Sequence, residues 1–90
     1  MKGVGIMPVI SRFCGITIKM YFRQKEHNPP HIHATYGEEI GLFSLKDGEM
    51  FEGDMELRYQ QKIKAFIRKY RDNLLTMWEN QRFEKLPYEE

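Results

Sequence analysis

The spacing of apolar residues changes once along this chain, near residue 54, and that change restricts the fold more than any other feature. Before it, apolar side chains recur at every second position, as in Ile16, Ile18, Met20 and Phe22. That period of two is typical of a strand with one buried face. After it, apolar residues recur at steps of three and four, which is typical of an amphipathic helix. The chain is therefore predicted to place strands first and helices last.

Turn-forming residues divide the first half of the chain into four or five short strands. Gly15, Pro29-Pro30, Gly37-Glu38 and Asp47-Gly48 separate the apolar runs, and Asp-Gly is a strong hairpin signal. The predicted strands cover residues 8–13, 16–22, 31–36, 40–45 and 49–52. Strands followed by helices predict an α+β fold: a small antiparallel sheet with the helices packed on one of its faces.

The second half of the chain predicts two C-terminal helices. Asp54 is the expected N-cap, with Glu56 in the first turn, where the helix dipole favours negative charge. A narrow apolar stripe follows, formed by Tyr59, Ile63, Phe66, Ile67, Tyr70, Leu74, Met77 and Trp78. The stripe runs through Asp72, which could cap a second helix, so we expect a kink or break near that residue.

The length of 90 residues predicts a single domain over residues 7–90, preceded by an N-terminal extension at residues 1–6. A domain this small buries only about 60% of its unfolded surface, so a metal, a dimer or a partner would help it fold. The single cysteine, Cys14, is expected to be a small buried apolar side chain and excludes an internal disulfide. Without a disulfide framework or an apolar run of about 20 residues, we expect a cytoplasmic protein with no membrane partner.

Charge is segregated along the chain although the net charge is only +1. Acidic residues dominate residues 38–56, whereas residues 57–71 contain six basic residues and no acid. The basic residues are Arg58, Lys62, Lys64, Arg68, Lys69 and Arg71. They form either a solvated helix face or a surface for nucleic-acid phosphates or an acidic partner. The acidic segment could instead neutralise this helix, within one molecule or across a homodimer.

All three histidines lie within seven residues, at His27, His31 and His33. His31 and His33 are two apart, so a strand places both on one face, about 7 Å apart at Cα. Pro29-Pro30 could hold His27 above that face, and Glu38 could return towards it. Three readings remain open: a zinc-like divalent metal site, proton transfer by an imidazole, and anchoring of the loop through backbone carbonyls.

These residues carry a resemblance to a known family. The segments involved are Met7-Pro8-Val9-Ile10, Met20-Tyr21-Phe22, His27-Asn28-Pro29-Pro30-His31-Ile32-His33-Ala34 and Tyr36-Gly37-Glu38. The chain resembles the bacterial domain of unknown function 4160 family over nearly its whole length from Met7. The resemblance implies a small bacterial or phage-borne protein with no established activity. It also implies an adjacent gene for another small protein, an arrangement suspected in places to be a toxin–antitoxin pair.

The sequence therefore supports two hypotheses about function. The first is a non-enzymatic interaction module that binds a protein encoded by the adjacent gene. In this hypothesis, nucleic acid is a further candidate partner, bound through Arg58, Lys62, Arg68 and Lys69 of the basic helix.

The second hypothesis is an enzyme: a nuclease or other hydrolase centred on His27, His31 and His33. His31 or His33 would transfer the proton, and His27 would orient the substrate or bind a metal. Arg23 or Lys25 would stabilise phosphate charge. For nucleic acid bound by the basic helix, as in the first hypothesis, an exposed Tyr21, Tyr36 or Tyr59 could stack on bases.

Overall fold

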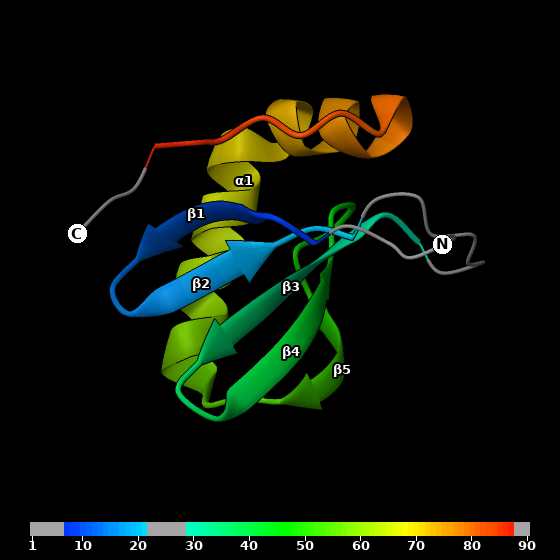
Figure 1. Cartoon of the computed structure of the whole chain (residues 1–90). Helices are drawn as coiled ribbons and strands as arrows, with labels where there is room; N and C mark the ends of the chain where they lie inside the picture. The colour runs from blue at the N-terminus through cyan, green and yellow to red at the C-terminus, as the bar shows by residue number, and fades with distance from the viewer. Residues whose placement is uncertain (1–6, 22–28, 88–90) are drawn as a thin grey trace, which may run out of the picture.

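The structure is a computed structural model that describes residues 7–21 and 29–87, and Figure 1 shows the arrangement of its elements. The strands are β1 (Val9–Phe13), β2 (Ile16–Lys19), β3 (His31–Tyr36), β4 (Glu39–Ser44) and β5 (Met50–Asp54), and the helix is α1 (Leu57–Asn80). The strands pair in the order β1-β2-β3-β4-β5, each antiparallel to its neighbour. The predicted α+β class and the antiparallel sheet are therefore confirmed.

Short turns connect β1 to β2, β3 to β4 and β4 to β5. Cys14 and Gly15 both have positive φ, 52° and 79°, as a type I′ turn between two paired strands requires. Cys14 is exposed at this turn, so the prediction of a buried thiol is wrong. The predicted Asp47-Gly48 hairpin is present: the Gly48 N–H donates to the Ser44 carbonyl at 2.8 Å, and Gly48 has a φ of 76°.

The helix begins later than predicted, because Asp54 belongs to β5. Its backbone pairs with Ile40 of β4, so Asp54 is the last residue of the sheet and not a helix cap. Glu56 occupies the N-cap position without a side-chain capping hydrogen bond, and the first turn has no acidic residue. The Glu56 N–H instead donates to the Glu39 carboxylate at 2.8 Å. The expectations for Asp54 and Glu56 at the helix start are thus wrong.

One helix is present where two were predicted. Its backbone departs from helical geometry at Tyr70 (φ −114°, ψ 22°), two residues before the expected break at Asp72. Apolar residues on both sides of this kink, such as Ile63 and Leu74, are fully buried. The continuous apolar stripe therefore keeps one bent helix in contact with the sheet, and no cap interrupts it.

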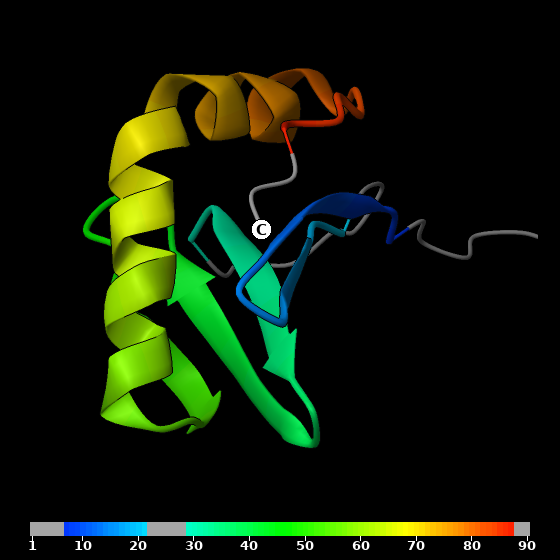
Figure 2. The same ribbon diagram turned by 90° about the vertical axis from the view of Figure 1, so that its left-hand side faces the viewer.

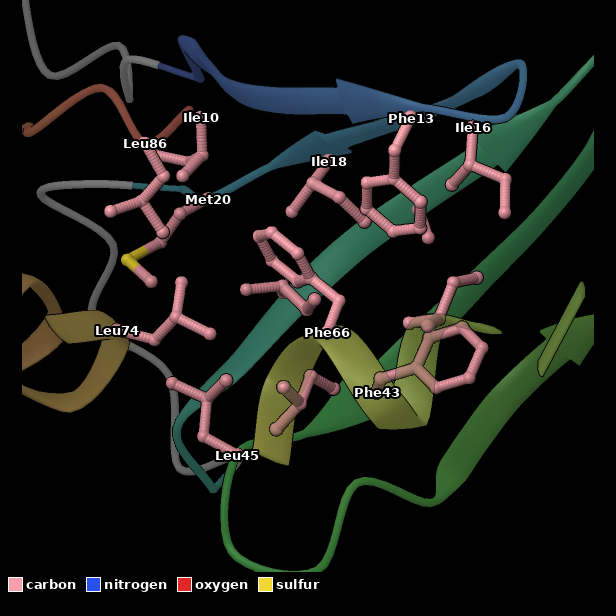
Figure 3. Packing of buried hydrophobic residues seen from close by; sticks show 14 of the residues in the cluster. Ile10, Phe13, Ile16, Ile18, Met20, Phe43, Leu45, Phe66, Leu74 and Leu86 are labelled. Atoms are coloured by element: carbon pink, nitrogen blue, oxygen red, sulfur yellow. The ribbon is translucent and has the colours of Figure 1, made fainter. Parts of the chain in front are cut away.

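The first half of α1 covers one face of the sheet, and the second half bends over its end (Figure 2). Side chains from β1, β2, β3 and β4 meet those of α1 and of residues 82–87 in one apolar core (Figure 3). Ile16, Ile18 and Met20 are fully buried there as expected, while Phe22 lies outside the described residues. We call the sheet face that α1 covers the covered face, and the opposite one the open face.

The C-terminal segment runs back beside β1. The Leu86 N–H donates to the Ile10 carbonyl at 2.9 Å, and the Ser11 hydroxyl donates to the Pro87 carbonyl at 2.6 Å. This contact covers part of the outer edge of β1, an edge that would otherwise be open to pairing with another chain.

Candidate functional site

Strand β3 places His31 and His33 on the open face. Their neighbours Ile32 and Ala34 are fully buried on the covered face, and successive side chains alternate between faces. The ring centroids of His31 and His33 are 5.3 Å apart, so the predicted proximity of these two imidazoles is confirmed. His27, Arg23 and Lys25 lie outside the described residues, so the three-histidine cluster stays a prediction.

His31 is enclosed although it belongs to the open face. Only 1% of its surface is exposed, because Trp78 of α1 and Phe51 of β5 close over it, with ring centroids 5.1 Å and 5.6 Å from the imidazole. Its Nδ1 lies 2.8 Å from the Pro29 carbonyl oxygen, a hydrogen bond that requires the proton on Nδ1. This geometry matches the anchoring role considered for the histidines, since it fixes the entry into β3.

His33 has a more open environment. It is half-buried, and the edge of the Tyr21 ring packs at 5.2 Å from its centroid. Lys19 on β2 and Leu42 on β4 are its direct cross-strand neighbours. His33 is thus partly exposed, in contrast to His31, although its Nε2 is itself buried.

The described residues contain no group of three histidine, cysteine, aspartate or glutamate side chains that could hold a metal ion. His31 and His33 could supply two nitrogen ligands. The carbonyl bond at His31 Nδ1 is the outer contact that metal-binding histidines usually make. A zinc-like site would need further ligands, for which the sequence offers His27.

Glu38 and Tyr36 lie at the other end of β3 from His31. Glu38 is exposed in the turn between β3 and β4. Strand β3 extends five residue steps from His31 to Tyr36, so its two ends lie about 17 Å apart. Tyr36 faces α1, and its ring stacks on that of Tyr59 with centroids 3.9 Å apart. Neither residue can join a site centred on His31, so the expectation that Glu38 returns to the histidines is wrong.

The tyrosine stack has an electrostatic consequence. The hydrogen bond between Tyr59 and Tyr36, together with burial, raises the pKa of Tyr59. The Arg58 guanidinium lies 4.8 Å from the Tyr59 ring centroid and donates to the Glu56 carboxylate at 2.8 Å. The hydrogen bond to Glu56 raises the pKa of Arg58. Arg58 is therefore engaged within the molecule.

The basic helix is partly neutralised by its own chain, one of the outcomes that the charge pattern allows. Lys64 pairs with Glu49 and Arg58 with Glu56. Lys62, Arg68 and Lys69 are exposed on α1. Lys62 and Lys69 border a shallow cavity of about 220 Å³ whose other walls are Phe13, Cys14, Ala65 and Phe66.

The open face also carries apolar residues that the sequence did not single out. Ile40 and Phe51 are 52% and 42% exposed, and Leu42 is half-buried beside them. Ile40 pairs with Thr35, and Leu42 pairs with His33, so they continue the surface of β3 across β4. The alternation of apolar residues gives each strand two faces, but only the strand pairing gathers these side chains into one surface.

No helix in the described part of the chain is both long enough and apolar enough to span a membrane. Comparison with the curated proteins found no match to this chain, and comparison with the solved structures found none. The family model described as "Domain of unknown function (DUF4160)" matches residues 15–79, which contain β2, β3, β4, β5 and nearly all of α1. This match confirms the resemblance found from the sequence, and the chain belongs to the DUF4160 family.

Proposed function

We propose that this chain is a non-enzymatic interaction module that binds another protein through the open face of its sheet. The partner would be the product of an adjacent gene, in a pair of the toxin–antitoxin kind, and the complex would form in the cytoplasm.

The observation that carries the proposal is the exposure of large apolar side chains on the open face. In an antiparallel sheet with one solvated face, that face is normally polar. Here Ile40 and Phe51 are 52% and 42% exposed, with Leu42 and the Tyr21–His33 ring pair beside them. An apolar patch with a charged rim is the usual composition of a protein-binding surface.

Charge favours a protein over a nucleic acid on this surface. Glu52 and Asp54 of β5 are exposed along one side of it. Carboxylates beside the aromatic residues would repel a phosphate backbone, whose binding depends on positive charge along its path. Helix α1, which carries the exposed Lys62 and Lys69, covers the opposite face of the sheet (Figure 2), so these lysines would not compensate for the carboxylates.

The test is co-expression with the product of the adjacent gene, followed by purification through a tag on this chain. We expect a stable complex with the unmodified chain and loss of the complex with Phe51→Ser. The control is Leu57→Ser, because Leu57 is 66% exposed but lies on α1. A complex that survives Phe51→Ser but not Leu57→Ser would assign binding to the helix and refute the proposal.

One observation favours a second candidate, a histidine-dependent nuclease or other hydrolase. His31 donates from Nδ1 to a carbonyl, so its Nε2 is the ring nitrogen that could accept a proton or bind a metal. The ring centroids of His31 and His33 are 5.3 Å apart. If this candidate is right, His33→Ala abolishes hydrolysis of single-stranded RNA or DNA while the variant still unfolds cooperatively. A purified protein without hydrolytic activity, with or without added zinc, would exclude it.

A further inference from the structure

We propose that the open face also binds a second copy of this chain, in competition with the product of the adjacent gene, with the two copies packed face to face about a two-fold axis parallel to the strands. This inference rests on the proposed function, because it uses the same binding surface.

The proposal begins with two rows of side chains that cross the open face. Residues directly opposite one another on paired strands point to the same face. The pairing gives one row of Arg12, Thr17, Thr35, Ile40 and Asp54. It gives a second row of Val9, Lys19, His33, Leu42 and Glu52.

Both rows have the same polarity. Each carries a base near β1, Arg12 or Lys19, and an acid on β5, Asp54 or Glu52. Between its base and its acid, the first row carries Thr17, Thr35 and Ile40, and the second carries His33 and Leu42. Arg12, Glu52 and Asp54 are exposed and Lys19 is half-buried. No ion pair within residues 7–21 and 29–87 involves any of the four.

Such a surface is complementary to itself in one orientation. A two-fold rotation about an axis parallel to the strands places β5 of one copy over β1 of the other. Because β4 then lies over β2, Ile40 and Leu42 face Thr17 and Lys19 of the other copy. Asp54 on β5 faces Arg12 on β1 directly, and Glu52 lies one strand away from Lys19. The acidic side of each copy therefore lies over the basic side of the other. Two-fold interfaces are self-complementary in this way, and packed sheets keep their strands within about 30° of one another.

The alternative face-to-face axis is disfavoured by the same charges. A two-fold axis perpendicular to the strands would place β5 over β5 and β1 over β1. Glu52 and Asp54 would then face their own copies, and like charges placed across an interface are unfavourable. The charge pattern therefore selects one of the two arrangements.

The size of the face limits the strength of the dimer. Five strands about 4.8 Å apart, each about 17–20 Å long, give roughly 400 Å² of flat area on each copy. A stable interface usually covers about 800 Å² on each partner. We therefore expect a dissociation constant in the micromolar range or weaker, and one that rises with salt because four rim charges on each copy contribute.

The experiment is sedimentation equilibrium of the full chain from about 1 µM to about 1 mM, with three double variants. Arg12→Glu/Lys19→Glu makes both sides of the face acidic, and Glu52→Lys/Asp54→Lys makes both sides basic. Each alone should raise the dissociation constant at least tenfold. An equimolar mixture of the two should restore association, because every cross-pair is then of opposite charge.

The third variant, Lys62→Glu/Arg68→Glu, is the matched control. It reverses two exposed bases on α1 and changes the net charge by the same amount as Arg12→Glu/Lys19→Glu. It should leave the dissociation constant unchanged within twofold. If either double variant on the face fails to fold by circular dichroism, the single variants Lys19→Glu and Glu52→Lys replace it in the same mixing experiment.

Three results would overturn the proposal: a monomer at every concentration, a dimer that both charge reversals leave intact, or variants that fail to associate when mixed. These results are separable from failure of the proposed function. A monomeric chain that loses the adjacent gene product on Phe51→Ser would keep the interaction module and reject the second copy. If the mixed charge-reversal variants dimerise as predicted but the chain forms no complex with that product, the second copy is kept and the adjacent gene product is rejected as the partner.

Discussion

The two faces of the sheet come from alternate residues of the same strands, yet they have become different surfaces. On the covered face, Ile18, Ile32 and Phe43 are buried beneath α1. On the open face, half-exposed polar residues lie next to exposed Ile40 and Phe51. The covered face is a core that excludes water. The open face is partly apolar, and no helix of the described residues lies over it as α1 lies over the covered face, which is why we propose it as the binding surface.

His31 shows that the two faces are not separated everywhere. It points to the open side but is as buried as the core, because the kinked end of α1 brings Trp78 over the start of β3. At that end of the sheet, one helix closes the core and shields a polar ring. The boundary between the core and the proposed binding surface therefore lies between His31 and His33, two residues apart on one strand.

The largest effect should come from the covered face. Phe66→Ala removes a buried ring that stacks on Phe13 with centroids 4.9 Å apart, and it should lower the free energy of unfolding by about 3–5 kcal/mol. Urea denaturation followed by circular dichroism measures this change. The exposed Leu57→Ala should cost no more than about 0.5 kcal/mol. Similar losses for both would mean that α1 does not form the core with the sheet.

The next largest effect should separate the two histidines. His31→Ala loses a buried ring and a hydrogen bond to the Pro29 carbonyl, so it should cost about 2 kcal/mol. His33→Ala, at a half-buried position, should cost less than about 1 kcal/mol. Both are compared by urea denaturation at pH 8. A larger loss for His33 would contradict the division between an anchoring histidine and a surface histidine.

The strand-to-helix order was predictable because apolar spacing reports directly on which side chains are buried. That signal gave the α+β class, the antiparallel sheet and all eight residues of the helical stripe, six of which are buried in α1. It failed where backbone pairing decides the outcome. Asp54 has the side chain of a helix cap, but its backbone pairs with Ile40, and no local pattern in the sequence reveals that contact.

The candidate site was predictable only along one strand. The spacing of His31 and His33 placed them on one face, but nothing local indicated that Trp78 and Phe51 would bury the first of them. Cys14 was expected to be buried because its neighbours are apolar. The hairpin instead needs two residues with positive φ, and Cys14 is at the first of those positions. Contacts between distant segments, which a single sequence does not encode visibly, account for both differences.

A smaller effect should appear at high pH, on the covered side of β3. Because the pKa of Tyr59 is raised in the folded state, the folded chain holds this proton more tightly than the unfolded chain. The contribution of Tyr59 to the free energy of unfolding is fully present at pH values below the ordinary tyrosine pKa of about 10. It is lost as the pH rises through the raised pKa of the folded state. Urea denaturation at pH 8 and pH 11 should therefore show a drop that Tyr59→Phe reduces. An equal drop in Tyr59→Phe would assign it to other groups.

The smallest effect should come from the open face, where one matched pair of substitutions compares the two surfaces directly. Ile40→Thr keeps the β-branched shape at a position that is 52% exposed, so the free energy of unfolding should change by less than about 0.5 kcal/mol. Ile32→Thr makes the same chemical change at a fully buried position on the adjacent strand and should cost several-fold more, because a hydroxyl is then buried in the core. Both are measured at about 1 µM, where we expect the chain to be monomeric. If Ile40→Thr destabilises the monomer as much as Ile32→Thr does, then Ile40 is part of the core, and the open face loses an apolar anchor on which its role in binding depends.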